Sequence, residues 1–594
     1  MSAIYGIFGT GNFHLLKSMG ERLSHRGTEV TEWSPAPRVY FGSRSFENKH
    51  LSKRSSDIPL IANASLYNRI EVAEKLKLQG INSDPDLTED LIYSAYQAFN
   101  TGCFQIINGD FVIALWDLEK KRLILSRDIL GSRSLYYWIA PDLFAFASEY
   151  KALLVLDEFE PKPDLESVQY LQASKYLLSG RTLMEGIHSV KSAHFLEVSE
   201  RDLVQQRYWD ITMSPKKMFA DEAQEELKKL FLQSIDRRLS GVESLQAELS
   251  GGIDSSAVVA AMRMARPNEN IKTFTIGDDQ NDPEIILARR IADRFNTEHH
   301  EVIVEPNNLI LDLPAFVWHL EDPIGRTEGY LYFKLMEILS NQGSVIFGGS
   351  VSDSLFSGMP RHKLVKMMQI FPLGRVPFEE FYNYTQVSSQ PRSISGKLMK
   401  KLYFRGGDPK APIVLGTDSQ INPITLPRHK KGLLNHVLRE GLLNGVPNSM
   451  AKIEKTHMAY GIEFRSPFTD KDLVDFSSKL TEDLKMRAFQ EKYILRKTLG
   501  SLLPKEVVER PKFPQRMAYD NKLSEVLESL ADSYLNPIAV KDRGFFVRED
   551  MDRLRRRING KPYSSIQAMR IWTAVLTEIW AQIFLDHRGE PNFQ

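Results

Sequence analysis

The sequence lacks several features that would assign it to a class at once. It has one cysteine, Cys103, in 594 residues, which excludes an internal disulfide and a cysteine-cluster metal site. No apolar run reaches the roughly 18 residues of a membrane span, and residues 1–5 lack the basic and apolar regions of a secretion signal. These absences favour a cytoplasmic protein without a membrane partner, in which Cys103 is a core residue.

The sequence also lacks an excess of charge of either sign. Lysine plus arginine and aspartate plus glutamate both number 76, so there is no global basic field and no nucleic-acid partner is expected. The hydrophobic fraction of 42% and the charged fraction of 26% are typical of a globular protein. A chain of this length is expected to form two or more domains.

One short stretch, residues 250–256, has the composition of a phosphate-binding loop between a strand and a buried helix. Its two adjacent glycines let backbone N–H groups approach an anion, and the next helix directs its positive dipole end to the same place. Three serine hydroxyls add donors, and an aspartate beside phosphate suits a divalent cation, whereas a plain glycine turn needs neither. The expected binding residues are Ser250, Gly251, Gly252, Asp254, Ser255 and Ser256.

This stretch resembles the pyrophosphate-binding loop of the PP-loop ATP pyrophosphatase family. It has no Gly-Lys-Ser/Thr ending of the Walker type. Members of the resembled family split ATP between its α and β phosphates to adenylate a substrate. The resemblance therefore implies ATP and Mg²⁺, with Asp254 as a metal ligand.

Residues 1–208 alternate short strands with a few helices, which indicates stacked antiparallel sheets with helices outside. Strands are expected at 4–8, 111–117 and 122–126, with a hairpin of 135–138 and 143–147. Helices are expected at 13–23, 70–78 and 89–99. Residues 205–210 and 213–217 are expected to link this half to an amphipathic helix at 220–239.

Ordered motifs in this half resemble class B asparagine synthetases. In that family the half is a glutaminase whose N-terminal cysteine attacks the glutamine amide. Here position 2 is Ser2, and the family's Asn-Gly-Glu is Asn63-Ala64-Ser65, so the thiol and the carboxylate for the glutamine ammonium are missing. We therefore expect a degenerate glutaminase. The motifs are His25-Arg26-Gly27, residues 63–68, 108–111, 127–131, 135–137 and 147–151.

The C-terminal half alternates strands at 271–276, 299–304 and 344–347 with helices at 283–295 and 309–320. Such alternation indicates a parallel sheet with ligands at the carboxyl ends of its strands. His299 and His300 are adjacent and would face opposite sides of a strand, so they are not expected to share a metal.

The resemblance continues through this half and implies further site residues. Ile276 lies in the segment that supports the adenine, Gly349 approaches the nucleotide, and Asp353 is a second Mg²⁺ ligand beside Asp254. Ser350 stands where asparagine synthetases have the glutamate associated with the proton of ammonia, and Val351 replaces a glycine. Serine is no base at neutral pH without help, which argues against ordinary asparagine synthesis.

Two catalytic residues are implied further along the chain. Lys512 matches the lysine that stabilises charge on the acyl-adenylate. Glu463 lies in the segment that supplies the glutamate of a base dyad in the related β-lactam synthetases, with Tyr330 or Tyr460 as its partner; the alternative is a buried ion pair with Arg465. Lys492 and Arg496 are expected to contact phosphate or to be structural.

Residues 361–449 resemble the family least. Their proline- and glycine-bearing loops are locally basic at Lys397, Lys400, Lys401 and Arg405, which predicts either a solvated face or a contact with substrate or partner.

The implied fold combines α/β and α+β parts. Residues 1–208 form a degenerate, N-terminal-nucleophile hydrolase-like αββα domain of the glutamine amidotransferase type. Residues 209–594 form a PP-loop ATP pyrophosphatase domain with a parallel sheet and a helical C-terminal part.

The sequence has lost the glutaminase residues at Ser2 and Ser65 and the glutamate at Ser350. The function expected from these losses is an ATP-dependent amide synthesis whose amine belongs to the substrate. A lasso-peptide cyclase, which closes a macrolactam on a leader-cleaved precursor peptide and contacts a leader peptidase, fits best. An ammonia-dependent asparagine synthetase, a β-lactam synthetase and a non-catalytic scaffold remain as alternatives. The missing tyrosine at position 350 disfavours the β-lactam synthetase, and the intact loop disfavours the scaffold.

Overall fold

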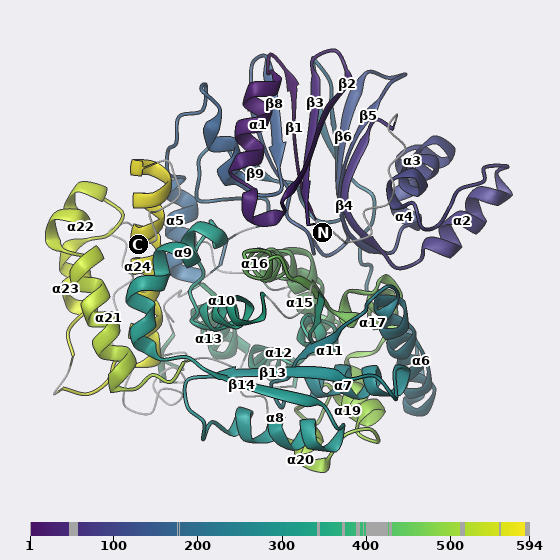
Figure 1. The fold of residues 1–594 in the computed structure, drawn as a ribbon. Helices are drawn as coiled ribbons and strands as arrows, with labels where there is room; N and C mark the ends of the chain where they lie inside the picture. Colours follow the sequence, from purple (N-terminus) through teal and green to yellow (C-terminus); the bar gives the residue numbers. More distant parts are fainter. Residues whose placement is uncertain are drawn as a thin grey trace.

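The structure is a computed structural model of the chain. In Figure 1, two sheets of the N-terminal half stand above a C-terminal half built around a parallel sheet. None of the helices in the described part combines the length and hydropathy that a membrane crossing requires. The structure describes residues 2–46, 58–174, 176–177, 179–340, 345–370, 375–387, 393–395, 397–398, 426, 431–510, 517–557 and 560–587.

The N-terminal half is a sandwich of two antiparallel sheets. Side chains from alternating strand positions, such as Phe41, Val112 and Leu125, are buried between the sheets. The strands of one sheet, in hydrogen-bonded order, are β2 (Glu29–Ala36), β3 (Val39–Ser45), β1 (Ser2–Gly9), β8 (Leu143–Ala147), β7 (Tyr136–Ala140) and β9 (His188–Ser189). The other sheet contains β11 (Leu203–Arg207), β10 (His194–Val198), β6 (Arg122–Arg127), β5 (Gly109–Asp117) and β4 (Leu60–Leu66).

Helices cover both outer faces of this sandwich. α1 (Phe13–Glu21) packs on β3 of one sheet, and α3 (Thr88–Phe99) packs on β4 of the other, which confirms the predicted αββα layering. α1 starts at Phe13 because the Asn12 side chain caps it, accepting a hydrogen bond from the Leu15 N–H at 2.9 Å. The remaining elements are α2 (Arg69–Leu78), α4 (Cys103–Ile106), α5 (Leu165–Ser174), η1 (Ser24–Arg26), η2 (Asn100–Gly102) and η3 (Tyr150–Val155).

Cys103 is a core residue, as predicted. It is fully buried at the start of α4, and this burial raises the pKa of its thiol. The thiol is therefore uncharged and chemically inert at neutral pH.

The predicted linker is wrong in its first part. Residues 205–207 belong to β11, an edge strand whose side chains are mostly exposed, so its polar composition resembles that of a linker. The chain after it is tied to the C-terminal half, because Ser214 N–H donates to the Ser478 carbonyl at 3.1 Å and Lys216 N–H donates to that of Lys479 at 2.8 Å. α6 (Ala220–Leu239) then forms over the predicted residues.

The sheet of the C-terminal half has five parallel strands in the order β14-β13-β12-β15-β16. β12 is central, and the carboxyl ends of all five strands lie at one edge, as the strand–helix alternation predicted. The strands are β12 (Leu245–Glu248), β13 (Ile271–Gly277), β14 (Glu298–Ile303), β15 (Val345–Phe347) and β16 (Glu463–Arg465). The helices between them include α7 (Ile253–Ala265), α8 (Pro283–Arg294), α9 (Leu309–Leu320), α10 (Glu328–Leu339) and η4 (Pro306–Asn308).

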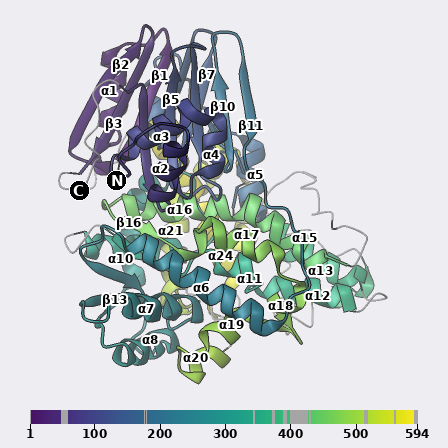
Figure 2. The same cartoon turned by 90° about the vertical axis from the view of Figure 1, so that its right-hand side faces the viewer.

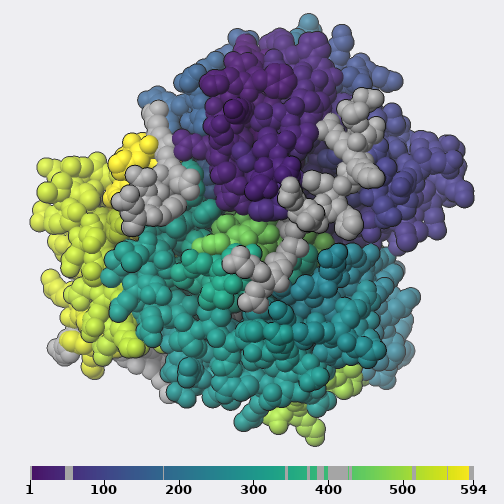
Figure 3. Space-filling view, viewed as in Figure 1, coloured from purple at the N-terminus to yellow at the C-terminus, as the bar shows by residue number. Residues whose placement is uncertain are grey.

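α6 packs against both α7 and α19 (Tyr493–Leu499), as the rotated view shows (Figure 2). α16 lies between the parallel sheet and the N-terminal strands in both ribbon views, and the two halves touch directly in Figure 3. The helices after β15 are α11 (Ser352–Phe356), α12 (Pro360–Ile370), α13 (Arg375–Val387), α15 (Leu433–Glu440), η6 (Gly441–Gly445) and α16 (Val446–Met458).

A helical C-terminal part follows β16, as predicted. α5 of the N-terminal half packs on α13 and on α24 of this part, so the two halves share helical contacts as well. Of the predicted basic stretch, Lys400, Lys401 and Arg405 lie outside the described residues. The elements are η7 (Pro467–Thr469), α17 (Lys471–Lys479), α18 (Glu482–Lys485), β17 (Met486–Arg487), β18 (Gln490–Glu491), α19 (Tyr493–Leu499), α20 (Lys505–Glu509), α21 (Asn521–Tyr534), α22 (Pro537–Arg543), α23 (Arg548–Leu554), α24 (Ser565–Ala581) and η8 (Gln582–His587).

Candidate active site

The glycine loop joins the central strand β12 to α7 at the carboxyl edge of the sheet. Gly251 has φ +64°, and a Cβ on it would lie 3.0 Å from the Glu284 carbonyl oxygen, so glycine suits both its conformation and its space. The Ser255 hydroxyl accepts a hydrogen bond from the Ser250 N–H at 3.1 Å. The Ser256 hydroxyl is buried and has no hydrogen-bond partner among the described residues. Residues 250–256 thus form a folded loop, called the cradle below, in which the Ser256 hydroxyl is available to donate a hydrogen bond.

The loop after β15 lies directly against this cradle. A Cβ on Gly349 would stand 2.7 Å from Asp254 Cβ, so only glycine permits this approach. The Ser352 hydroxyl donates to Asp254 Oδ1 at 2.7 Å and ties the two loops together. Val351 has φ +79°, a left-handed conformation that strains a β-branched residue and suits the glycine of the resembled family. The two loops that were predicted to contact the nucleotide are therefore adjacent.

A single lysine joins the two carboxylates that were predicted to bind Mg²⁺. Lys492 Nζ pairs with Asp254 Oδ2 and lies 2.5 Å from Asp353 Oδ1. Burial lowers the pKa of the Lys492 ammonium, and Asp254 opposes that shift. A Cβ on Gly358 would fall 2.1 Å from Asp353 Oδ1, so this glycine makes room for the pair. Sequence inspection missed Gly358, although it follows Asp353 closely in the chain.

These residues fit ATP and Mg²⁺. The cradle presents backbone N–H groups and the unpartnered Ser256 hydroxyl at the start of α7, which suits phosphate. The described residues contain no group of three His, Cys, Asp or Glu side chains that could hold a metal by themselves. Two carboxylates completed by phosphate oxygens are the arrangement that Mg²⁺ commonly takes.

Replacing Lys492 by methionine should make the folded protein depend on Mg²⁺. Without the ammonium, Asp254 and Asp353 repel each other, and we expect a loss of about 1–3 kcal/mol. Millimolar Mg²⁺ without nucleotide should restore much of the melting temperature of Lys492→Met and change that of the wild type little. Thermal melts with and without Mg²⁺ measure this.

The control is Lys485→Met, which removes another buried lysine. Lys485 donates to Asn435 Oδ1 at 2.8 Å rather than to a carboxylate pair, so Mg²⁺ should not rescue its loss. If Mg²⁺ shifted the melting temperature of all three proteins equally, the assignment of Asp254 and Asp353 as Mg²⁺ ligands would be contradicted.

Lys512 lies outside the described residues, but the chain on both sides is fixed at this edge. Arg510 pairs with Glu284, whose backbone carbonyl lies against Gly251. On the other side, the Met517 N–H donates to the Thr327 hydroxyl at 3.3 Å. The role predicted for Lys512 stays a prediction.

Ile276 is buried near the end of β13, one strand away from the glycine loop. The neighbouring Thr275 hydroxyl donates to the Leu249 carbonyl and joins β13 to the start of the loop. His299 and His300 do not converge on a common partner: His299 Nδ1 lies 2.9 Å from the Thr273 hydroxyl, and His300 Nε2 lies 3.0 Å from Glu298.

Glu463 lies in a buried ion-pair cluster, and its predicted role as a base stays a prediction. Glu463 Oε1 accepts hydrogen bonds from Ser65 Oγ at 2.7 Å, Arg133 at 2.9 Å and Arg465 at 3.0 Å. Burial alone would raise the pKa of Glu463, but Arg465 and Arg133 outweigh it and hold the pKa well below the ordinary value. The buried ion pair, the alternative considered, is what forms.

Neither predicted tyrosine joins Glu463. The Tyr330 hydroxyl donates to Asp312 at 2.6 Å, and the Tyr460 ring packs 5.2 Å from the Phe333 ring. Glu463 instead joins the two halves, because Ser65 and Arg133 belong to the N-terminal domain. Ser65 stands where the resembled family has its glutamine-binding glutamate, and its hydroxyl is occupied by this contact.

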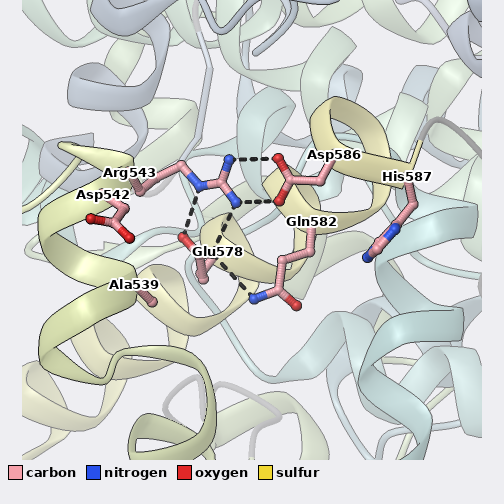
Figure 4. Close-up of a pocket in the computed structure, with 7 residues that line it drawn as sticks. All are labelled: Ala539, Asp542, Arg543, Glu578, Gln582, Asp586 and His587. Carbon is pink, nitrogen blue, oxygen red and sulfur yellow. Dashed lines mark hydrogen bonds and ion pairs between the residues drawn. The ribbon is translucent and has the colours of Figure 1, made fainter.

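A surface hollow of about 480 Å³ lies on α22, α24 and η8, away from the glycine loop (Figures 1 and 4). Its centre is Arg543, which pairs with Glu578 at 3.2 Å and with Asp586 at 2.5 Å. These charges satisfy one another, and none of the predicted site residues that the structure describes lines the hollow.

The fold and the paired loops define a class of ATP-dependent carbon–nitrogen ligases with an amidotransferase-type N-terminal domain. Residues 226–582 match the family described as Asparagine synthase, and residues 1–209 match the glutamine amidotransferase domain. The chain belongs to the asparagine synthase family.

Curated relatives share this layout along most of their length. Asparagine synthetase [glutamine-hydrolyzing] 1 of Bacillus subtilis is 25% identical over 97% of this chain and 95% of its own. A putative asparagine synthetase [glutamine-hydrolyzing] of Mycobacterium bovis is 26% identical over 90% and 85%. Amidase chyE of Penicillium rubens is 24% identical over 77% of each chain.

Two solved structures show a remote likeness to the chain. An allosteric regulatory enzyme of purine biosynthesis is 12% identical, covering 51% of this chain and 81% of its own, with a TM-score of 0.28. An NH3-dependent NAD synthetase from Campylobacter jejuni is 17% identical, covering 32% and 90%, with a TM-score of 0.18. These TM-scores are too low to support any further argument.

Proposed function

We propose that the chain activates a carboxylate with ATP and Mg²⁺ and joins it to an amine of the same substrate. The proposed reaction closes a macrolactam on a leader-cleaved precursor peptide, as in lasso-peptide cyclases. The observation that carries this proposal is a contrast between the two halves. Asp254 and Asp353 meet at Lys492 beside the glycine loop, which supports ATP binding, whereas the Ser65 hydroxyl is bound to Glu463 in place of a carboxylate for glutamine.

In the proposed reaction an Asp or Glu side-chain carboxylate attacks the α-phosphorus of ATP and pyrophosphate leaves. Bound Mg²⁺ would screen the phosphate charge, held by Asp254 and Asp353. The glycine loop would hold the departing pyrophosphate through its N–H groups, and Lys492 would be free to follow the phosphates once the cation replaced it. The peptide's own amine then displaces AMP and forms the amide.

A second candidate is an ammonia-dependent asparagine synthetase. The names of the relatives favour it. Ser350 argues against it, since that position offers no carboxylate to handle the proton of ammonia. A β-lactam synthetase is less well supported, because neither Tyr330 nor Tyr460 pairs with Glu463.

The substrate that the protein consumes distinguishes the macrolactam-forming reaction from asparagine synthesis. Purified protein is incubated with ATP and Mg²⁺, once with aspartate plus ammonium and once with a pool of linear peptides. Each peptide has a free amino terminus and one Asp or Glu. We expect pyrophosphate release and loss of one water from a peptide. Pyrophosphate and asparagine from aspartate and ammonium alone would overturn the macrolactam proposal.

A precursor peptide and a leader peptidase are the proposed partners. The amine of the precursor peptide is exposed only after the leader is cleaved, so the cyclase would act after the peptidase. Contact between the two proteins would let the cleaved peptide pass directly to the cyclase. Coexpression followed by affinity purification tests this contact.

A further inference from the structure

A buried glutamate and a buried histidine meet beside the glycine loop. Glu248 is the last residue of β12, and His457 lies in the last turn of α16. His457 Nε2 is 3.0 Å from Glu248 Oε1, and the two residues are only 1% and 9% exposed. Neither residue has a role predicted from the sequence.

The hydrogen bonds of His457 fix how many protons the pair holds. Its Nδ1 lies 2.7 Å from the Ile453 carbonyl oxygen, which can only accept, so Nδ1 carries a hydrogen. One further proton must lie between Nε2 and Glu248 Oε1, since two lone pairs would repel at that distance. The pair is therefore neutral as a whole, either as imidazolium with carboxylate or as imidazole with carboxylic acid. Glu248 Oε2 remains to receive a second proton.

Glu248 Oε2 points at the loop after β15. A Cβ on Gly348 would lie 2.8 Å from this oxygen, and the next residue, Gly349, is the one that touches Asp254. The carboxylate thus stands at the end of β12, beside the loop after the neighbouring strand β15 that carries Ser350, at the junction of the two loops predicted to bind the nucleotide. α10 and α16 cover this side of the sheet, which faces the N-terminal half (Figure 1).

Aromatic side chains from neighbouring elements surround the pair. Tyr332 of α10 lies 6.5 Å from the His457 ring, and Phe464 of β16 lies 5.0 Å from it. Burial raises the pKa of Tyr332, with Glu248, Glu328 and Glu284 adding to the shift, so this tyrosine stays neutral. No arginine or lysine is paired with Glu248 in the described part of the chain, unlike Glu463.

We propose that Glu248 is the base of amide formation and that His457 is its positioning residue. This proposal rests on the proposed function and deepens it. As the amine nitrogen bonds to the acyl carbon, the carbon–oxygen bond to AMP breaks and AMP leaves with the electron pair. The proton released by nitrogen passes to Glu248 Oε2, while His457 holds Oε1 in place. Atoms and charge balance without another reactant.

The test separates activation from amide formation in Glu248→Gln. The probe is the peptide pool, followed by ATP–pyrophosphate exchange and by mass spectrometry of the cyclised peptide. Glutamine keeps the size and the contact with His457 but accepts no proton. We expect exchange at the wild-type rate and cyclisation slower by about 10²-fold or more. Hydroxylamine, which is largely uncharged at neutral pH, should trap the activated peptide equally in both proteins.

Glu454→Gln is the matched control, because Glu454 is buried on the same helix and pairs with Arg26 rather than with a group at the loop. It should leave the ratio of cyclisation to exchange unchanged. Glu248→Gln with both rates unchanged, or with both lowered in proportion, would overturn the role as a base. Absence of exchange in the wild type would instead overturn the proposed function.

Discussion

Asp254→Asn should lower pyrophosphate release by about 10²–10³-fold. The change keeps the shape of the side chain and its hydrogen bond with Ser352, but removes the charge that faces Lys492 and that would face Mg²⁺. Because Asp353 remains, the variant should keep residual activity that rises with Mg²⁺ concentration. Initial rates of pyrophosphate release over a Mg²⁺ series measure the effect.

Asp312→Asn is the control for this prediction. Asp312 also pairs with a lysine, Lys334 at 3.0 Å, but on α9 and α10 rather than at the glycine loop. Its removal should leave the Mg²⁺ dependence unchanged. An Asp254→Asn protein with wild-type rates would show that the carboxylate does not belong to the nucleotide site.

Arg26→Met should destabilise the protein by about 3–5 kcal/mol. Arg26 is fully buried between the two halves, where it pairs with Glu149 of its own half and with Glu454 of α16, 3.0 Å from Nη2 to Oε2. Methionine fills a similar volume but leaves two buried carboxylates without their shared partner. Urea denaturation measures the loss, and Arg289→Met, which breaks an exposed pair with Glu301, should cost less than about 1 kcal/mol.

This network also predicts a pH dependence. Burial alone would raise the pKa of Glu149, but Arg26, His25 and Lys151 hold it well below its usual range. A depressed carboxyl pKa stabilises the fold above the unfolded value of about 4.3 and loses that contribution as the pH falls. The wild type should therefore lose stability more steeply than Arg26→Met below about pH 4.3. If the free energy of unfolding fell equally with pH in the two proteins, Arg26 would not be what lowers the pKa of Glu149.

Local patterns predicted much of the fold. The spacing of apolar residues gave α6 at its observed bounds, and the alternation of strands and helices gave the parallel sheet around β12. These features depend on residues that are close in sequence, so composition and periodicity are enough to predict them. β11 was mistaken for a linker because an exposed edge strand has few apolar residues.

The site was harder to predict, because its contacts join distant parts of the chain. The motif placed Asp254 and Asp353 in one site, but nothing in the sequence indicated that Lys492 bridges them. The partners of Glu463 were not predicted, because Ser65 and Arg133 lie in the other half. Glu248 and His457 are 209 residues apart, so only the folded chain brings them together.

The origin of the amide nitrogen decides whether the attacking amine belongs to the substrate. The reaction is run on the peptide pool with ATP and Mg²⁺ in ¹⁵N-ammonium and amide-¹⁵N-glutamine, and the product is weighed by mass spectrometry. We expect a peptide that is lighter by one water and contains no ¹⁵N, because the nucleophile comes with the substrate. A product that has gained one ¹⁵N atom, from either source, would contradict this expectation.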